Sequence, residues 1–201
     1  MNKRHVVRSA FALATAGLII GMITGTASAT TIREPAALRA RTAMSDSFSY
    51  RSSKAMNKKW HEIGSLYNIT HWKMSGGAVV HMPSGNHDQS ELWTKKVYDL
   101  RGATKVKIKL RAKWKLSKKA QDHLTVFVER QHPDPLFTSS YDVYHVSGSS
   151  KGKWKSITIN AQDAVGYKVK IGFAVITNEA DPFWFKGRGA RVDSIKVISY
   201  Q

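Results

Sequence analysis

The chain has 201 residues, of which 42% are hydrophobic, and this is enough for one domain with a substantial buried core. Its formal net charge is +18 and its sequence pI is about 10.2, so the expected partners are polyanions: nucleic acid, anionic lipid, acidic glycans or cell-wall polymers. The sequence contains no cysteine, which excludes disulfides and a cysteine-linked lipid anchor.

The N-terminus has the pattern of a secretory signal peptide. Three cations (Lys3, Arg4 and Arg8) precede an apolar, small-residue stretch over residues 9–25, and Ala27-Ser28-Ala29 has the form of a cleavage site. The pattern predicts a signal peptide over residues 1–29 and a mature chain that begins at Thr30. We therefore expect a secreted, extracellular protein, either free or associated with the cell wall, whose partners do not include intracellular nucleic acid.

Two further expectations concern the mature chain as a whole. No later stretch is long and apolar enough to cross a membrane, so no transmembrane segment is expected there. The style of the leader and the lack of cysteine favour a bacterial exoprotein.

Residues 30–59 are poor in large apolar side chains and rich in Ala, Ser, Arg and Lys. They are interpreted as a flexible N-terminal tail, with a short helix over residues 33–43 and a first strand over residues 48–50. The folded domain is expected to span residues 60–201.

From residue 60 onward, short apolar or alternating runs are interrupted by turn-forming residues about every ten positions, which indicates an antiparallel β-sandwich or barrel. No segment of helical period longer than about ten residues occurs in the mature chain, which argues against an α/β enzyme fold. The expected strands cover residues 66–72, 78–82, 91–98, 105–116, 123–130, 141–146, 155–160, 167–177 and 191–200.

The most regular of these strands covers residues 105–116, where apolar and cationic residues alternate strictly. Only a strand places two such sets on opposite faces, so one face is expected in the core. The other face carries Lys105, Lys107, Lys109, Arg111, Lys113 and Lys115. This row has two interpretations: a solvated surface that protects a strand from aggregation, or a binding surface for a polyanion.

Further cations support the second interpretation if their strands are neighbours of this one. Lys151, Lys153 and Lys155 approach or enter one strand, Lys168 and Lys170 begin another, and Arg191 and Lys196 lie on the last.

The order of short motifs resembles a known class of module. Residues 98–104 read Tyr-Asp-Leu-Arg-Gly-Ala-Thr before the alternating strand, and residues 187–197 read Gly-Arg-Gly-Ala-Arg-Val-Asp-Ser-Ile-Lys-Val at the last strand. This succession is similar to the MAM-like and galactose-binding-like jelly-roll modules of secreted bacterial peptidases and adhesins. The resemblance covers about residues 60–200 and implies a jelly-roll sandwich with a binding or stabilising role, often toward glycans. Ser194 stands where the closing motif usually has a second Asp.

The segment between the last two expected strands contains three consecutive aromatic residues followed by two cations. The candidate binding residues in it are Phe183, Trp184, Lys186 and Arg188. Three adjacent aromatic side chains cannot all enter one core from a strand, so at least one is expected at a rim. They either close the end of the sandwich, offer a platform for a sugar ring, or contact a membrane.

Catalytic and metal-binding patterns are weak in this sequence. No nucleophile elbow, zincin helix or phosphate-binding loop occurs, and no zinc spacing is matched. Asp122 and Asp193 stand at the positions where some of the similar modules bind calcium; they either hold a structural cation or cap turns. No other cofactor is expected.

The sequence thus predicts a single all-β domain, an antiparallel β-sandwich of jelly-roll topology. Its predicted role is that of a non-enzymatic binding module for an extracellular glycan or polyanion of the cell envelope or a host surface. A secreted antagonist or toxin-like protein that acts on anionic membranes is the alternative, and a glycan-cleaving enzyme comes third.

Overall fold

The computed structural model describes residues 37–64, 72–82, 89–118, 121–134, 138–177 and 189–201. These residues belong to one compact unit, Ala37–Gln201. The expected signal peptide and its cleavage site lie outside the described residues. Among the residues that are described, no helix has the length and hydropathy needed to cross a membrane.

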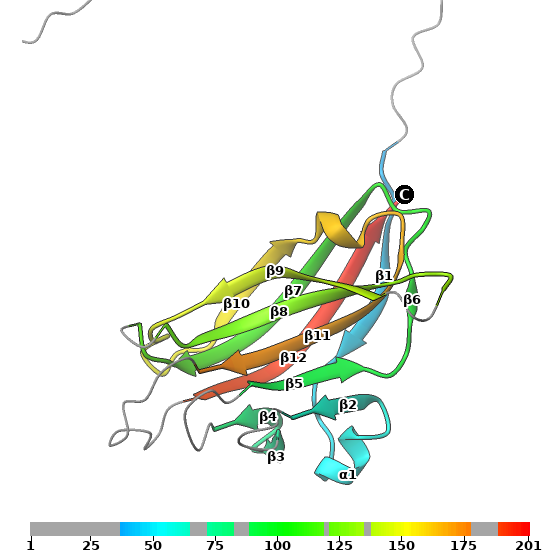
Figure 1. The fold of residues 1–201 in the computed structure, drawn as a ribbon. Helices are drawn as coiled ribbons and strands as arrows, with labels where there is room; N and C mark the ends of the chain where they lie inside the picture. Colours follow the sequence, from blue (N-terminus) through cyan, green and yellow to red (C-terminus); the bar gives the residue numbers. More distant parts are fainter. Residues whose placement is uncertain (1–36, 65–71, 83–88, 119–120, 135–137, 178–188) are drawn as a thin grey trace, which may run out of the picture. The chain divides into compact units, whose positions relative to one another are not determined.

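The described chain forms two antiparallel sheets that pack face to face (Figure 1). The first sheet has the spatial order β10 (Lys155–Asn160), β7 (Lys105–Lys115), β12 (Gly189–Tyr200), β4 (Ala78–His81) and β3 (Lys73–Ser75), and β1 (Ala40–Asp46) also pairs with β12. The second has the order β2 (Trp60–Ile63), β5 (Gln89–Thr94), β11 (Lys168–Ile176), β8 (His123–Gln131) and β9 (Thr138–Val146), and β6 (Tyr98–Asp99) also pairs with β11.

Strands that follow one another along the chain repeatedly change sheet. β7 leads to β8 in the opposite sheet, β9 leads back to β10, and β11 leads to β12. Two short helical segments complete the fold: α1 (Ser53–Met56) and the 3-10 turn η1 (Gln162–Ala164). The predicted all-β jelly-roll sandwich is confirmed.

Most of the predicted strands lie where the alternation placed them. β4, β7, β8, β9, β10, β11 and β12 agree with their predicted bounds to within three residues. The strand expected over residues 91–98 is divided into β5 and β6. The strand expected over residues 66–72 lies outside the described residues except for Trp72, which is buried.

The N-terminal part of the described chain differs from the expectation. Residues 40–46 form β1, which pairs with the C-terminal half of β12, where a helix had been expected up to residue 43. Residues 48–50 are not a strand, and Phe48 has a positive φ of 47°. The compact unit therefore begins before residue 60. β1 is difficult to detect because Met44 is its only large apolar residue.

A buried carboxylate fixes this N-terminal segment. Asp46 is 9% exposed, and its carboxylate accepts hydrogen bonds from the backbone N–H of Phe48 (2.8 Å), the hydroxyl of Tyr50 and the indole Nε1 of Trp60 (3.0 Å). Burial and the bond to Asp46 raise the pKa of Tyr50 above its ordinary value. Asp46 thus ties β1 to the start of β2 and holds Phe48 in a conformation that non-glycine residues seldom adopt.

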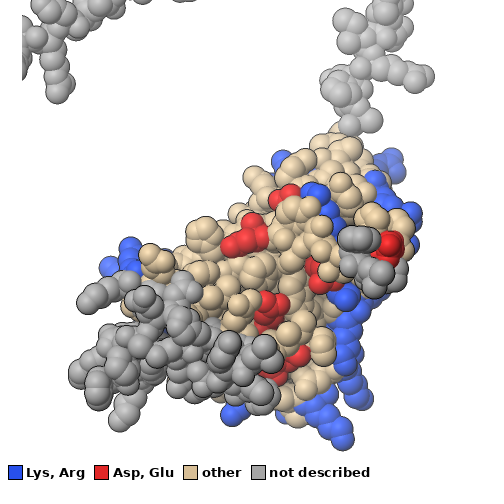
Figure 2. Space-filling view, in the orientation of Figure 1, with Lys and Arg blue, Asp and Glu red and all other residues tan. Residues whose placement is uncertain are grey.

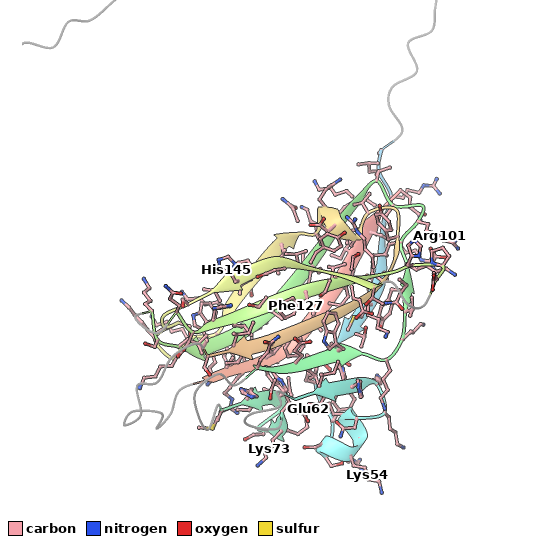
Figure 3. All side chains as sticks on the ribbon, viewed as in Figure 1. Lys54, Glu62, Lys73, Arg101, Phe127 and His145 are labelled. Atoms are coloured by element: carbon pink, nitrogen blue, oxygen red, sulfur yellow. The ribbon has the colours of Figure 1, made fainter. Side chains whose placement is uncertain are left out.

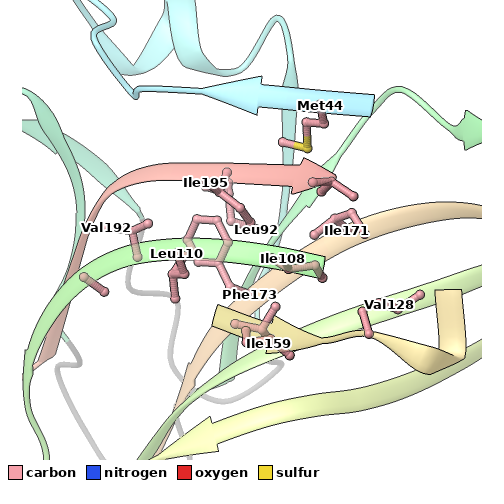
Figure 4. Packing of buried hydrophobic residues seen from close by; sticks show 14 of the residues in the cluster. Met44, Leu92, Ile108, Leu110, Val128, Ile159, Ile171, Phe173, Val192 and Ile195 are labelled. Carbon is pink, nitrogen blue, oxygen red and sulfur yellow. The ribbon is translucent and has the colours of Figure 1, made fainter. Parts of the chain in front are cut away.

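Hydrophobic side chains from both sheets meet in the core, with Phe173 among them (Figure 4). Aromatic residues from distant parts of the chain contact Phe173 there. The ring of Phe173 on β11 lies 5.8 Å from Phe48, 5.4 Å from Trp60 and 5.0 Å from Trp72, measured between ring centroids. Ile108 and Leu110 of β7 enter the same core from the other sheet. The sandwich presents two outer faces, and these carry the polar side chains of the strands.

Candidate functional site

The cationic row of β7 lies on the outer face of the first sheet, as its alternation predicted. Val106, Ile108, Leu110 and Ala112 are buried, whereas the Lys and Arg residues between them are exposed or half-buried. We use the name basic face for this outer surface, formed by the outward side chains of β7 and β12 together with Trp154. The six cations of β7 repeat about every 7 Å along it, twice the rise per residue of a strand.

β12 extends the basic face, because two of its cations lie directly opposite cations of β7. Lys196 is the cross-strand partner of Lys109, and Arg191 is the partner of Lys113. Like charges directly opposite each other in a sheet are destabilising. Asp193 lies at a bulge in β12, and its carboxylate forms an ion pair with Arg111. Most of the positive charge on this face is therefore not neutralised by the strands that carry it.

Not every cation from the sequence analysis joins this surface. Lys155 lies on β10, which pairs with β7. Its Cα is opposite that of the buried Ala112, so Lys155 is not in register with the cations of β7. Lys168 and Lys170 lie on β11 in the other sheet. The basic face is thus made by β7 and β12, and β11 contributes nothing to it.

Two aromatic rings lie among the cations of the basic face. The indole of Trp154 is 5.0 Å from both the guanidinium carbon of Arg111 and the Nζ of Lys113. The ring of Tyr200 is 5.8 Å from the Nζ atoms of Lys105 and Lys107. Such contacts hold the cationic groups in defined positions beside a flat apolar surface. The sequence analysis did not identify either ring as a site residue. The one available signal was the period of two in β12, which places Tyr200 on the same side of the strand as Lys196.

The two sheets differ strongly in charge. The strands of the first sheet contain eleven Lys and Arg and two Asp. Those of the second contain three Lys and Arg and five Asp and Glu. Figure 2 shows the outer face of the second sheet, where Asp and Glu lie over the centre and Lys and Arg lie toward the edges. The positive charge is thus concentrated on one side of the sandwich.

The outer face of the second sheet carries a different arrangement, which we call the β8–β11 face. Trp93 and Phe127 stack at 5.8 Å over Gly172, where a Cβ would lie 2.5 Å from the indole. The indole Nε1 of Trp93 donates to Glu91 (2.5 Å), and Lys170 lies 3.6 Å from Glu129. Phe127 remains half-buried on this face (Figure 3). Glu91 and Glu129 on the β8–β11 face thus have partners within the sheet.

The remaining predicted binding residues, Phe183, Trp184, Lys186 and Arg188, lie outside the described residues. The two predicted cation ligands have different environments. Asp122 is 2% exposed, and its Oδ2 accepts the backbone N–H of Ser117 (3.2 Å), which is the turn-capping role. Asp193 is engaged by Arg111. In the described part of the chain, no three His, Asp or Glu residues form a group that could hold a metal ion.

Comparison with known proteins supports the fold. No protein-family model matches the chain, and no curated protein does. Among solved structures, the K1 cleaved adhesin domain of Lys-gingipain from Porphyromonas gingivalis W83 superposes with a TM-score of 0.52 at 16% identity, over 77% of this chain and 96% of that domain. The K3 cleaved adhesin domain of the same protein gives 0.53 at 11% identity, over 79% and 100%.

A family 11 carbohydrate-binding module from Clostridium thermocellum, solved with a β-1,3-1,4-mixed-linked tetrasaccharide, is also similar. Its TM-score is 0.51 at 12% identity, over 82% of this chain and 95% of that module. At these identities the similarity establishes the β-sandwich fold, and it agrees with the resemblance to galactose-binding-like jelly-roll modules.

Proposed function

We propose that this protein is a secreted, non-enzymatic module that binds an acidic extracellular glycan through its basic face. The observation that carries the proposal is the register between β7 and β12, which places Lys109 opposite Lys196 and Lys113 opposite Arg191. An anionic polymer that lies along these strands neutralises charges that otherwise repel each other. The expected signal peptide, which would bring the protein to extracellular glycans, is part of the same proposal.

The aromatic rings favour a glycan over a simple polyanion. Trp154 and Tyr200 lie within 6 Å of cations near the two ends of the β7 row. A sugar ring presents apolar C–H groups that pack on an aromatic surface, while its acidic substituent pairs with Lys or Arg. Charge and stacking are thus available together at two places on one face.

The contacts of the carboxylates on the β8–β11 face support a binding role without hydrolysis. Glycoside hydrolysis requires two carboxyl groups set across a bound sugar, one of them able to donate a proton. On the β8–β11 face, Glu91 accepts from Trp93 and Gln89, and Glu129 contacts Lys170 and Gln131. Both glutamates are thus engaged by neighbouring side chains of their own sheet.

The test is binding to polygalacturonate, heparin and neutral β-glucan across a salt series. We expect binding to the two acidic polymers that weakens with salt, because exposed charges are screened. The double variant Lys107→Glu and Lys109→Glu should bind about tenfold or more weakly, since it reverses the charge at the centre of the row. It leaves the pair between Arg111 and Asp193 intact.

A matched control separates local from overall charge. The double variant Lys58→Glu and Lys95→Glu makes the same change in net charge at exposed residues away from the basic face. If both double variants lose binding equally, net charge alone is responsible and the proposed site is wrong. A third outcome would place the ligand on the β8–β11 face: Phe127→Ala abolishes binding to the neutral glucan, whereas both charge variants retain it.

Two further assays address the alternative functions. Release of an entrapped dye from vesicles of phosphatidylcholine and phosphatidylglycerol would support action on membranes. Release of reducing sugar ends from the polymers would support an enzyme. We expect adsorption to the acidic polymers without either activity.

A further inference from the structure

A pocket of about 480 Å³ lies where β7 reaches its C-terminal end, beside β12, β4 and the turn at residues 149–152. It shares Lys113 and Arg191 with the basic face. Its lining also includes Lys115, Lys151, Val80 and Met82. The volume is within the range of small-molecule binding sites, roughly 300 to 1,000 Å³.

Backbone geometry fixes the walls of this pocket. At Gly189, where φ is 130°, a Cβ would lie 2.1 Å from the carbonyl oxygen of His81, so glycine allows β12 and β4 to approach closely. On the opposite wall, the hydroxyl of Ser150 accepts the backbone N–H of Trp114 (3.2 Å), and the Ser150 N–H donates to the Trp114 carbonyl (3.0 Å). The turn is therefore tied to β7, and the pocket has a defined shape before any ligand enters.

The lining is strongly cationic. It contains Lys113, Lys115, Lys151 and Arg191, and its described members include no carboxylate. The Nη2 of Arg191 donates to the carbonyl of Ser75 (2.8 Å). Its Nε is buried and has no hydrogen-bond partner among the described residues. Four cations around one concave surface raise the local potential, which an anion lowers on binding.

The pocket also has an apolar component. Val80 is half-buried and Met82 is 55% exposed. An inorganic anion alone would leave these groups in water. A ligand that combines a negative group with a ring bearing C–H surface would contact both kinds of lining.

We propose that this pocket binds one anionic sugar residue, a hexose that carries a carboxylate or a phosphate. This residue stands at the end of the glycan that the basic face binds. The inference rests on the proposed function and adds to it a subsite with its own specificity. The acidic group lies among the four cations, and the ring lies against Val80 and Met82. Neutral sugars lack the group that the cations require.

The test follows amide NMR shifts of the ¹⁵N-labelled protein during titration with glucuronate, glucose 6-phosphate and glucose. Gly152 and Gly189 both line the pocket, and glycine amides are readily resolved. We expect these two amides to shift with one or both acidic sugars, with affinity in the millimolar range or tighter, and to stay unchanged with glucose. The sugar that binds distinguishes a carboxylate from a phosphate site.

The double variant Lys115→Gln and Lys151→Asn removes two charges from the pocket. Lys151 has a φ of 55°, and asparagine tolerates this conformation well. Affinity for the acidic sugar should fall about tenfold, since the loss of two nearby charges weakens the attraction. The matched control, Lys58→Gln and Lys95→Gln at exposed residues away from the basic face, should bind the acidic sugar as well as the unaltered protein.

The outcomes separate this inference from the proposed function. If neither acidic sugar shifts Gly152 and Gly189, or if glucose shifts them equally, the pocket inference is wrong, whereas binding to polygalacturonate still supports the basic face. If the pocket variant keeps its affinity for the acidic sugar, the four cations do not form the site. If the protein binds an acidic sugar in the pocket and no acidic polymer, the proposed function fails while the pocket stands.

Discussion

Replacement of Lys109 by Glu is expected to stabilise the protein while it weakens binding to an acidic polymer. Lys109 lies at the centre of the β7 row, opposite Lys196 on β12, and two residues from Lys107 and Arg111 on the same face. A carboxylate at this position would face cations on several sides. A repulsive cross-strand pair thus becomes an attractive one.

The size of the effect follows from the register. Cross-strand partners have Cβ atoms about 5 Å apart, and two unit charges at that separation interact by about 0.8 kcal/mol in water. Reversing one sign changes the interaction by up to twice that amount, and flexible side chains reduce it by spreading apart. We expect an increase of about 1 kcal/mol in the free energy of unfolding at low salt, or about 2 to 4 °C in Tm.

The assay is urea denaturation of the unaltered protein, Lys109→Gln and Lys109→Glu, at 20 and 500 mM NaCl. Gln should give about half of the gain at low salt, because it removes the repulsion without adding an attraction. Both gains should shrink at high salt, where the Debye length falls to a few ångströms. If Lys109→Glu is no more stable than the unaltered protein at low salt, the charges on this face do not repel each other appreciably, and the argument for a polyanionic ligand is refuted.

Three further changes probe the sandwich itself. Phe173→Ala should lower the free energy of unfolding by about 3 to 5 kcal/mol, because it leaves a cavity among three aromatic rings. Gly172→Ala should cost about 1 to 3 kcal/mol and alter the fluorescence of Trp93, since the new methyl group would collide with the indole. Tyr50→Phe should destabilise the protein at neutral pH by about 1 to 3 kcal/mol, because it removes a hydrogen bond to the buried Asp46. The pKa of Tyr50 is raised above its ordinary 10.0, so its contribution is complete below pH 10 and is lost as the pH rises further; Tyr50→Phe should show a weaker alkaline loss of stability.

Urea denaturation measures all three changes, and each has its own control. Phe173→Leu should cost clearly less than Phe173→Ala, and an equal cost would indicate that the cavity is not the cause. The loss from Gly172→Ala should be smaller in a Trp93→Leu background, because the collision is then relieved. If the unaltered protein and Tyr50→Phe lose stability in parallel between pH 8 and 11.5, Tyr50 is not the group that titrates.

Much of the fold could be predicted because its strands alternate with a period of two. The segments of β7 and β10 are readily assigned as strands, since each has one apolar face and turn-forming residues on both sides. β1 could not be predicted in this way. Apart from Met44, its residues are small or polar. It becomes a strand because β12 offers an unpaired edge and because Asp46 accepts hydrogen bonds from three donors in the folded protein.

The candidate site was predictable in part for a related reason. The alternation of β7 assigned its six cations to one face, but it contained no information about the neighbouring strand. The contributions of Lys196, Trp154 and Tyr200 depend on cross-strand register and on the position of the turn before β10, both of which are set by tertiary structure. The pocket at the end of β7 likewise requires four separate segments to meet.

The pairing of β1 with the end of β12 places the two ends of the compact unit next to each other. The backbone N–H of Arg39 donates to the carbonyl of Gln201 (2.8 Å), and Ala40 is the partner of Tyr200. Tyr200 in turn lies beside Lys105, at the end of β7 opposite to the pocket. Since Lys105 and Lys113 are eight residues apart on β7, an attachment point at either end of the unit lies about 27 Å from the nearest part of the pocket along the strand. A copy immobilised through a tag at either end of the unit would therefore be attached at the end of the sheet opposite to its pocket.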